Sequence, residues 1–353
     1  MSSKSEIVSP NRIGKDSQRT AAILDSAAFH GLAGKIVRAN DPFTEADPLA
    51  VLATTLVIFG NVVGHSPYFT VGYERHYLNL YAGIVGATSK GRKGQSSSTP
   101  IYIFRMVDSS WANNRITSGL SSGEGLITQV RDRLEQPIKR GNVVIDEGVS
   151  DKRLLLIESE LSQGLKLMGR EGNILSPTLR QAWDSGNLSP LTKHNQIKAT
   201  GAHISIIGHI TIEELMKHLC NTDRVNGFGN RFIWLAVTRS KTIPDPQCIP
   251  YQTLDEIVRE LSEAVTFGKT VQVMRRSIPA TELWEKVYPG LSEGRPGIVG
   301  TITSRAEAQV MRLACVYALL ALSDEVKVGH LKAALDFWKY AERSADSIFR
   351  KTG

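Results

Sequence analysis

The order of apolar and polar positions along the chain predicts strands alternating with helices. Apolar runs too short for helices predict strands over 69–73, 80–85, 143–147, 154–158, 203–210 and 232–237. Helical spacing and capping residues predict helices over 20–37, 48–63, 101–107, 121–134, 176–183, 212–219, 253–265, 280–288, 304–322 and 329–349. This succession predicts an α/β fold in which helices flank a sheet.

The predicted helix over 48–63 is apolar on nearly all sides, so we expect it to be buried against the sheet. Asp47 is suited to cap it, and Pro48 suits its first position. Three prolines in 241–252 indicate a linker. We therefore expect a disordered tail over 1–19, an N-terminal helical segment over 20–66, a core over 67–240 and a C-terminal helical domain over 253–353.

A glycine-rich, basic stretch over 86–94, GATSKGRKG, follows the predicted strand 80–85 and precedes a helix. A strand, a glycine-rich loop, a lysine and a helix in this order build a phosphate-binding loop. Glycines let backbone N–H groups surround an anion, and the lysine reaches the terminal phosphates. A basic surface loop is the alternative interpretation.

The stretch departs from the usual G-x-x-x-x-G-K-[ST] pattern. Arg92 stands where the lysine is expected, so Lys93 would take that role, and Gly94 follows where a hydroxyl is expected. Ser96 or Ser97 could supply that hydroxyl to Mg²⁺. The predicted nucleotide-binding residues of this stretch are Gly86, Thr88, Gly91, Arg92, Lys93, Gly94 and Ser96.

Two strand ends are acidic, and either could serve a bound nucleotide. Asp146-Glu147 matches the usual acidic dipeptide, whereas Glu158 and Glu160 follow a more apolar strand. A P-loop enzyme needs one carboxylate for Mg²⁺ and another to polarise the attacking water. A solvated strand end is the alternative for both.

Basic residues suggest two further contacts. The polar segment 186–201 would display Lys193, His194 and Lys198, either as a plain surface hairpin or as a contact to nucleic acid. Arg231 precedes the last predicted strand. It would pair locally or, in an oligomer, reach the neighbour's nucleotide.

Composition excludes some classes of protein but does not identify the function. The 353 residues carry a net charge of +7, which permits a polyanionic partner. Three scattered cysteines indicate neither a disulfide framework nor a zinc site, and they fit a reducing cytoplasm. The longest apolar stretch, 49–63, is too short to span a membrane, and the polar N-terminus has no signal-peptide core.

Taken in order, these stretches resemble the P-loop ATPase (helicase-like) module of phage, plasmid and integrated-element primase–helicase proteins. The resemblance runs from about residue 29 to 349. It is carried by VGATSKGRKGQSS, DKRLLLIESEL, ATGAHISIIGHIT and NGFGNRF, and also by segments 29–52, 119–132, 170–184, 304–320 and 330–349. It implies a RecA/AAA+-like P-loop fold that uses ATP and Mg²⁺.

The resemblance also implies roles for residues near the nucleotide. Lys93 would be the phosphate-loop lysine, and Ser96 and Glu158 would hold the metal. Glu160 would act on water, which favours Glu158 and Glu160 over the earlier acidic pair.

Other implied roles lie farther along the chain. His209 or Thr211 would sense the γ-phosphate, Arg231 would be an arginine finger, and Arg305 or Arg312 would contact nucleotide.

The function implied is an ATP-dependent, ring-forming helicase or translocase on single-stranded DNA in mobile-element replication, acting as a homo-oligomer such as a hexamer. The primase half that often precedes the module does not occur in this sequence, which implies a separate primase or replication partner. One alternative is a degenerate P-loop protein that binds nucleotide or DNA as a non-hydrolysing loader or scaffold. A small-substrate phosphotransferase is another.

Overall fold

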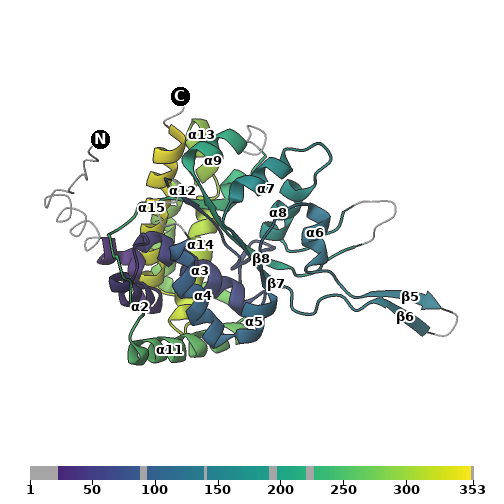
Figure 1. The fold of residues 1–353 in the computed structure, drawn as a ribbon, viewed down its shortest axis with the longest axis horizontal. Helices are drawn as coiled ribbons and strands as arrows, with labels where there is room; N and C mark the ends of the chain where they lie inside the picture. The colour runs from purple at the N-terminus through teal and green to yellow at the C-terminus, as the bar shows by residue number, and fades with distance from the viewer. Residues whose placement is uncertain (1–22, 88–93, 139–140, 191–196, 220–225, 351–353) are drawn as a thin grey trace, which may run out of the picture.

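A parallel sheet lies at the centre of the computed structural model, which describes residues 23–87, 94–138, 141–190, 197–219 and 226–350 (Figure 1). Within these residues the sheet has five strands in the order β4-β7-β8-β3-β9, all parallel. Their bounds are β4 Ile116–Thr117, β7 Arg153–Glu158, β8 His203–Ile210, β3 Tyr81–Val85 and β9 Phe232–Ala236. The predicted α/β class is confirmed.

Helices cover both faces of the sheet, and the period-two alternation of strand side chains divides the core accordingly. Ala82 and Ile84 of β3 belong to one hydrophobic cluster, whereas Tyr81 and Val85 belong to the other. The first face is covered by α2 (Gly31–Asn40), α3 (Pro48–Val63), α4 (Gln95–Val107), α11 (Tyr251–Thr270) and α14 (Ala306–Leu320). The second is covered by α6 (Gly123–Thr128), α7 (Leu161–Met168), α8 (Leu175–Asp184) and α9 (Ile212–His218). The helix α15 (Val328–Phe349) contributes to both clusters and packs along β9.

The expectation for α3 is confirmed. Every residue of the helix is buried, and its contacts include β3, β7 and β8. Asp47 accepts a hydrogen bond from the backbone N–H of Leu49, and Pro48 occupies the first turn. A helix that is apolar on all sides must be buried on all sides, which is why this segment could be placed from sequence.

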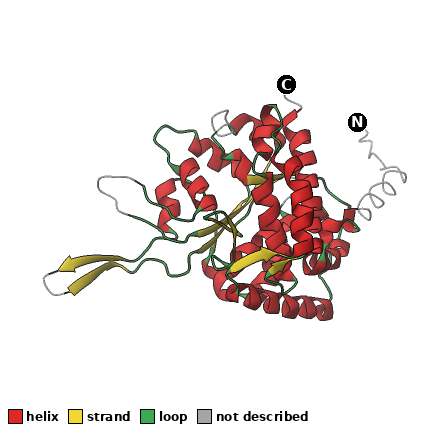
Figure 2. Cartoon of the chain, turned by 180° about the vertical axis from the view of Figure 1, so that it is seen from behind, coloured by secondary structure: helices red, strands yellow, loops and turns green. Residues whose placement is uncertain are grey.

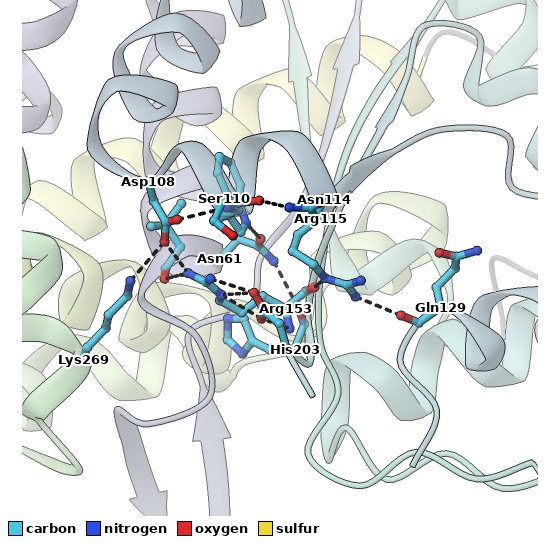
Figure 3. A network of polar contacts seen from close by, with 12 residues as sticks. Asn61, Asp108, Ser110, Asn114, Arg115, Gln129, Arg153, His203 and Lys269 are labelled. Carbon is cyan, nitrogen blue, oxygen red and sulfur yellow. Dashed lines mark hydrogen bonds and ion pairs between the residues drawn. The ribbon is translucent and has the colours of Figure 1, made fainter. Parts of the chain in front are cut away.

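Polar contacts fix α3 at the amino end of β7 (Figure 3). Arg153, the first residue of β7, donates to the backbone oxygen of Val62 at 2.8 Å and to Asp108 at 2.9 Å. Lys269 of α11 also bonds Asp108, at 3.1 Å. One network therefore joins the sheet to helices from distant parts of the chain.

The N-terminal and C-terminal segments share one core. In a second sheet, of order β11-β10-β1-β2 within the described residues, β10 (Val273–Arg276) pairs with β1 (Tyr68–Val71) and β11 (Glu325–Val326), and β2 (Glu74–Tyr77) pairs with β1. Helices α11, α14 and α15 pack in the same cluster as α2 and α3. Residues 253–350 are therefore packed against residues 23–66, and the predicted tail 1–19 lies outside the described residues.

An antiparallel hairpin extends away from the body in both views (Figures 1 and 2). It consists of β5 (Leu134–Ile138) and β6 (Gly141–Asp146). The predicted helix over 121–134 is wrong beyond α6, because Leu134 begins β5 and is 42% exposed. Ile145 is also exposed, so the hairpin carries apolar side chains into solvent.

Other predicted boundaries shift at helix ends. Within the described part of the predicted helix 20–37, residues 23–24 are helical, and the 3-10 turn η1 (Ala27–Phe29) separates them from α2. The predicted start of α11 at Thr253 is wrong, because the helix begins after Pro250 without a side-chain cap. Other elements within the described residues are η2 (Asp41–Phe43), α5 (Ser109–Asn114), η4 (Gly229–Arg231), α12 (Ile278–Ser292) and α13 (Gly297–Thr303). No helix in the described ranges has the length and apolarity needed to cross a bilayer.

Candidate functional site

The predicted phosphate loop lies between the carboxyl end of a central strand and the start of a helix. β3 ends at Val85, and Gly86 donates its backbone N–H to the carbonyl oxygen of Ile210, the last residue of β8, at 3.2 Å. Gly94 precedes α4. The intervening residues 88–93, which include the predicted Thr88, Gly91, Arg92 and Lys93, lie outside the described residues.

The strand order places this segment where α/β sheets commonly bind ligands. After β3 the chain continues to β4 at one edge of the sheet, whereas after the adjacent β8 it continues to β9 on the other side of β3. Connections that leave neighbouring strands in opposite directions open a crevice at their carboxyl ends. The glycine-rich segment follows one of these two strands.

The first turn of α4 buries two hydroxyl groups near this segment. Ser96 is fully buried, and Ser97 is 4% exposed. The hydroxyl oxygen Oγ of Ser97 has no hydrogen-bond partner within the described residues. A buried hydroxyl without a partner is costly unless a ligand, ion or water satisfies it. Of the two serines considered from sequence, Ser97 therefore has the hydroxyl available for a ligand.

Glu158 lies at the same end of the sheet and holds a neighbouring loop. It is 6% exposed, and its Oε1 accepts the backbone N–H groups of Gly119 at 2.8 Å and Leu120 at 3.0 Å. The strand pairing puts Glu158 level with Gly208 and Gly83, so two strand spacings of roughly 4.8 Å separate its backbone from β3. Its observed contact is structural, because it fixes the loop that follows β4.

Glu160 is the exposed carboxylate beside it. It immediately precedes α7, and its Oε2 accepts a bond from Nε2 of Gln163 at 2.8 Å. Asp146, by contrast, is the last residue of β6, at the base of the β5–β6 hairpin, and Glu147 follows it. Asp146 is held there by a bidentate pair with Arg131 at 2.5 and 3.0 Å. Glu158 and Glu160 are thus the acidic pair at the carboxyl edge of the central sheet.

The tip of β8 carries the two predicted sensor residues. His209 is buried and lies level with Ile84 of β3. Thr211 caps α9, because its Oγ1 accepts the backbone N–H of Glu214 at 3.2 Å. His209 is therefore beside the phosphate-loop strand, and the Thr211 hydroxyl serves the helix terminus.

The predicted arginines lie at the opposite end of the sheet, where the parallel strands begin (the amino edge). Arg231 immediately precedes β9, is 5% exposed and bonds Asp184 at 2.6 Å, so the local-pairing interpretation describes its position. Because β9 runs parallel to β3, Arg231 is level with the residue before Tyr81, six residues or roughly 20 Å along the strand direction from the level of Gly86.

Arg305 and Arg312 lie at this amino edge too. Arg312 is buried, donates to the backbone oxygens of Asn79 and Trp183, and stacks 3.5 Å from the Trp183 ring centroid. Burial lowers the pKa of Arg312 to about 9. Arg305 pairs with Asp184 at 3.4 Å. Neither arginine is placed to contact a nucleotide at the carboxyl edge of the same chain.

The predicted nucleic-acid residues are only partly described. Lys193 and His194 lie outside the described residues, whereas Lys198 is exposed beside a bridge between Leu188 and Ala199. His203 of β8 is fully buried, and its Nε2 lies 2.9 Å from the carbonyl oxygen of Gly60.

Sequence reasoning missed the loop after β4. Residues 117–122 and parts of α6 line a cavity of about 150 Å³ at the carboxyl edge, beside the backbone groups that bind Glu158. The run of serines and glycines after Thr117 was a signal, but β4 has only two residues and shows no strand periodicity.

The described residues contain no cluster of three or more His, Cys, Asp or Glu side chains that could hold a metal ion. The chain matches no protein-family model, and no curated protein matches it either.

Proposed function

We propose that this protein is a P-loop ATPase whose nucleotide hydrolysis drives movement on single-stranded DNA, as in a helicase or translocase. The observation that carries the proposal is the placement of the glycine-rich segment. Its described ends, Gly86 and Gly94, lie just after the carboxyl end of β3 and just before α4, at the switch point between β3 and β8.

The residues at this edge fit an ATP phosphate group and a magnesium ion. Lys93 and the loop N–H groups would bind the terminal phosphates, and the unpaired Ser97 hydroxyl would supply a protein oxygen. Bound Mg²⁺ would neutralise charge that develops on the phosphates. Mg²⁺ commonly uses few protein ligands and several water or phosphate oxygens, so no carboxylate cluster is required.

Two acidic residues would divide their roles. Glu160 is exposed at the edge and is proposed to orient the attacking water, while Glu158 positions the loop 118–120 through its two backbone bonds. This assignment changes the role expected for Glu158 from metal ligand to positioning residue.

The test is ATP turnover with Mg²⁺, with and without single-stranded DNA. We expect Lys93→Ala to lower turnover by about 10²-fold, because a preorganised cation facing the phosphates is removed. Lys90→Ala, a control in the same loop with the same loss of charge, should retain most activity. Glu160→Gln should lower turnover by about 10²-fold while nucleotide binding persists. Wild-type protein that neither binds nor hydrolyses ATP would refute the proposal.

A non-hydrolysing loader or scaffold is the second candidate, and the contacts of Glu158 favour it. A carboxylate that already accepts two backbone N–H groups is less available to a metal, and Gly94 offers no hydroxyl. ATP binding that depends on Lys93, without turnover under any DNA condition, would select this function.

A homo-oligomer, such as a hexameric ring, is part of the proposal for a motor. The arginine finger expected to act across subunits, Arg231, gives this assembly little support, because its side chain is buried and paired with Asp184 of the same chain. Sedimentation of the protein with ATP and single-stranded DNA tests the assembly directly.

A further inference from the structure

A large cleft opens at the amino edge of the central sheet, away from the predicted phosphate loop. It has a volume of about 710 Å³, within the range of small-molecule sites. Its walls come from β1 and the following turn, from β10 and α12, from Asn230, and from the residues around the start of α14. An adjoining cavity of about 570 Å³ shares His76 and Arg305 with it.

The cleft presents arginine side chains that are only partly neutralised. Arg276 and Arg305 line the main cavity together with one carboxylate, Glu307. In the adjoining cavity, Arg312 donates hydrogen bonds to neutral acceptors, the backbone oxygens of Asn79 and Trp183 and the Asn79 amide oxygen. Guanidinium groups held by packing and aimed at one space bind phosphate groups well.

The carboxylates of the adjoining cavity do not offset this charge. Asp184 is shared between Arg231 at 2.6 Å and Arg305 at 3.4 Å, and Glu74 is exposed beside Arg75. The two cavities together are therefore lined by four arginines, Arg75, Arg276, Arg305 and Arg312, against three carboxylates, Glu74, Asp184 and Glu307.

Arg276 is the central group of the main cavity. Its guanidinium lies 5.1 Å from the ring centroid of Phe69 and 5.3 Å from that of Trp284. Its buried Nε has no hydrogen-bond partner in the described part of the chain. The aromatic rings hold the Arg276 guanidinium in place but supply no hydrogen-bond acceptor. An anion in the cleft would provide an acceptor for its unpaired Nε–H.

Aromatic and amide groups beside the arginines suit a planar ring. Trp284 and Tyr288 lie 5.6 Å apart between ring centroids, and Tyr288 is 45% exposed at the wall. The buried Oδ1 of Asn230 and Nδ1 of His76 have no partner within the described residues. Ring stacking together with unfilled polar groups is the chemistry that recognises a nucleobase.

We infer that this cleft binds a nucleotide unit, with its phosphate between Arg276 and Arg305 and its base against Trp284 and Tyr288. The nucleotide is either free or part of a single strand, because both present the same phosphate and base. The site is separate from the predicted phosphate loop, because the two lie at opposite ends of the paired strands β3 and β9. It does not depend on ATP hydrolysis.

Isothermal titration on Lys93→Ala protein tests the inference, because that background removes the predicted loop lysine. The probes are AMP, adenosine, and a short single-stranded oligodeoxythymidylate. We expect AMP or the oligonucleotide to bind, and adenosine to bind more weakly because it lacks the phosphate. Binding of AMP identifies a free nucleotide as a ligand, and binding of the oligonucleotide alone identifies a nucleic-acid strand. Binding of neither overturns the inference.

Variants then locate the binding. Arg276→Ala should weaken binding by about tenfold or more, through loss of charge-assisted hydrogen bonds. Arg275→Ala is the matched control, because Arg275 is the exposed neighbour on β10 and does not line the cleft. Tyr288→Ala, at a partly exposed position that should not affect folding, should weaken binding as well. Equal losses from Arg275→Ala and Arg276→Ala, or no loss from Arg276→Ala and Tyr288→Ala, would overturn the assignment. Loss of ATP turnover in Lys93→Ala bears only on the proposed ATPase.

Discussion

Asn61 offers the sharpest test of how α3 is fixed to the sheet. It is fully buried in the last turn of an apolar helix. Its Nδ2 donates to the backbone oxygens of Leu154 at 3.0 Å and His203 at 3.1 Å, and its Oδ1 accepts from Nε1 of Trp111 at 2.9 Å. Figure 3 shows Asn61 within this network. One side chain thus joins α3 to β7, β8 and α5.

Replacing Asn61 with alanine removes both the amide donor to the two carbonyl oxygens and the amide acceptor for the Trp111 N–H. Two buried bonds to carbonyl oxygens contribute about 1 kcal/mol each, and the Trp111 N–H left without an acceptor costs about 1–3 kcal/mol. We therefore expect Asn61→Ala to lower the free energy of unfolding by about 3–5 kcal/mol. Urea denaturation followed by circular dichroism measures this change from the shift in midpoint.

A double-mutant cycle separates the two contributions. Trp111→Phe keeps an aromatic ring but removes the N–H, so Asn61→Ala should cost about 1–3 kcal/mol less in that background. A control on the same helix, Thr54→Val, changes a buried hydroxyl with no hydrogen-bond partner in the described ranges and should cost little. Additive effects of Asn61→Ala and Trp111→Phe, or a cost of Asn61→Ala below about 1 kcal/mol, would refute the reasoning.

Three further predictions follow from single contacts. Gly83→Ala should destabilise the fold by about 3 kcal/mol in the same denaturation assay, because a Cβ there would lie 2.2 Å from the Trp234 ring. Glu158→Ala should lower stability by about 2 kcal/mol, since two backbone N–H groups after β4, one of them buried, lose their acceptor; Glu158→Gln, which keeps an acceptor, should lose less. Burial lowers the pKa of His203 from 6.5 to about 3, so stability should be fully present above pH 6.5 and fall as the pH drops toward 3. Replacing His203 with asparagine should reduce that slope by up to about 1.4 kcal/mol per pH unit, and an unchanged slope would contradict a buried neutral histidine.

Elements buried on both sides could be predicted from sequence, because burial leaves a continuous apolar run. The strands β3 and β8 and the helix α3 are examples, and their observed bounds differ little from the expected ones. Short strands such as β4 and β10 could not be predicted. They have few residues and mixed polarity, and pairing with distant strands defines them.

The β5–β6 hairpin shows how tertiary contacts override local spacing. Leu126, Val130 and Leu134 are spaced for one helical face, yet α6 ends at Thr128. Beyond it, Arg131 pairs with Asp146, and Asp132 donates its backbone N–H to the carbonyl oxygen of Lys198. These partners are remote in sequence, so no local pattern of residues could predict the contacts.

The candidate sites divide in the same way. The glycine-rich segment and Glu158 could be located from sequence, because a strand, a loop and a helix that are consecutive in the chain form that edge. The cleft at the amino edge could not, since Phe69, Arg276 and Trp284 meet only after β10 pairs with β1.

The position of Arg231 bears on how a ring of this protein could work. As an arginine finger it would have to leave Asp184 and the carbonyl oxygen of Gly227, both of which it bonds in the isolated chain. The Asp184 side chain is 41% exposed, so breaking this pair costs less than the ~3–5 kcal/mol of a fully buried pair, and a neighbouring nucleotide would have to offset that smaller cost. Arg305 is only partly buried and shares the same carboxylate at a longer distance. Release of Asp184 by Arg231 would therefore also change the charge facing the amino-edge cleft, and an oligomer that used Arg231 in trans should alter nucleotide binding there.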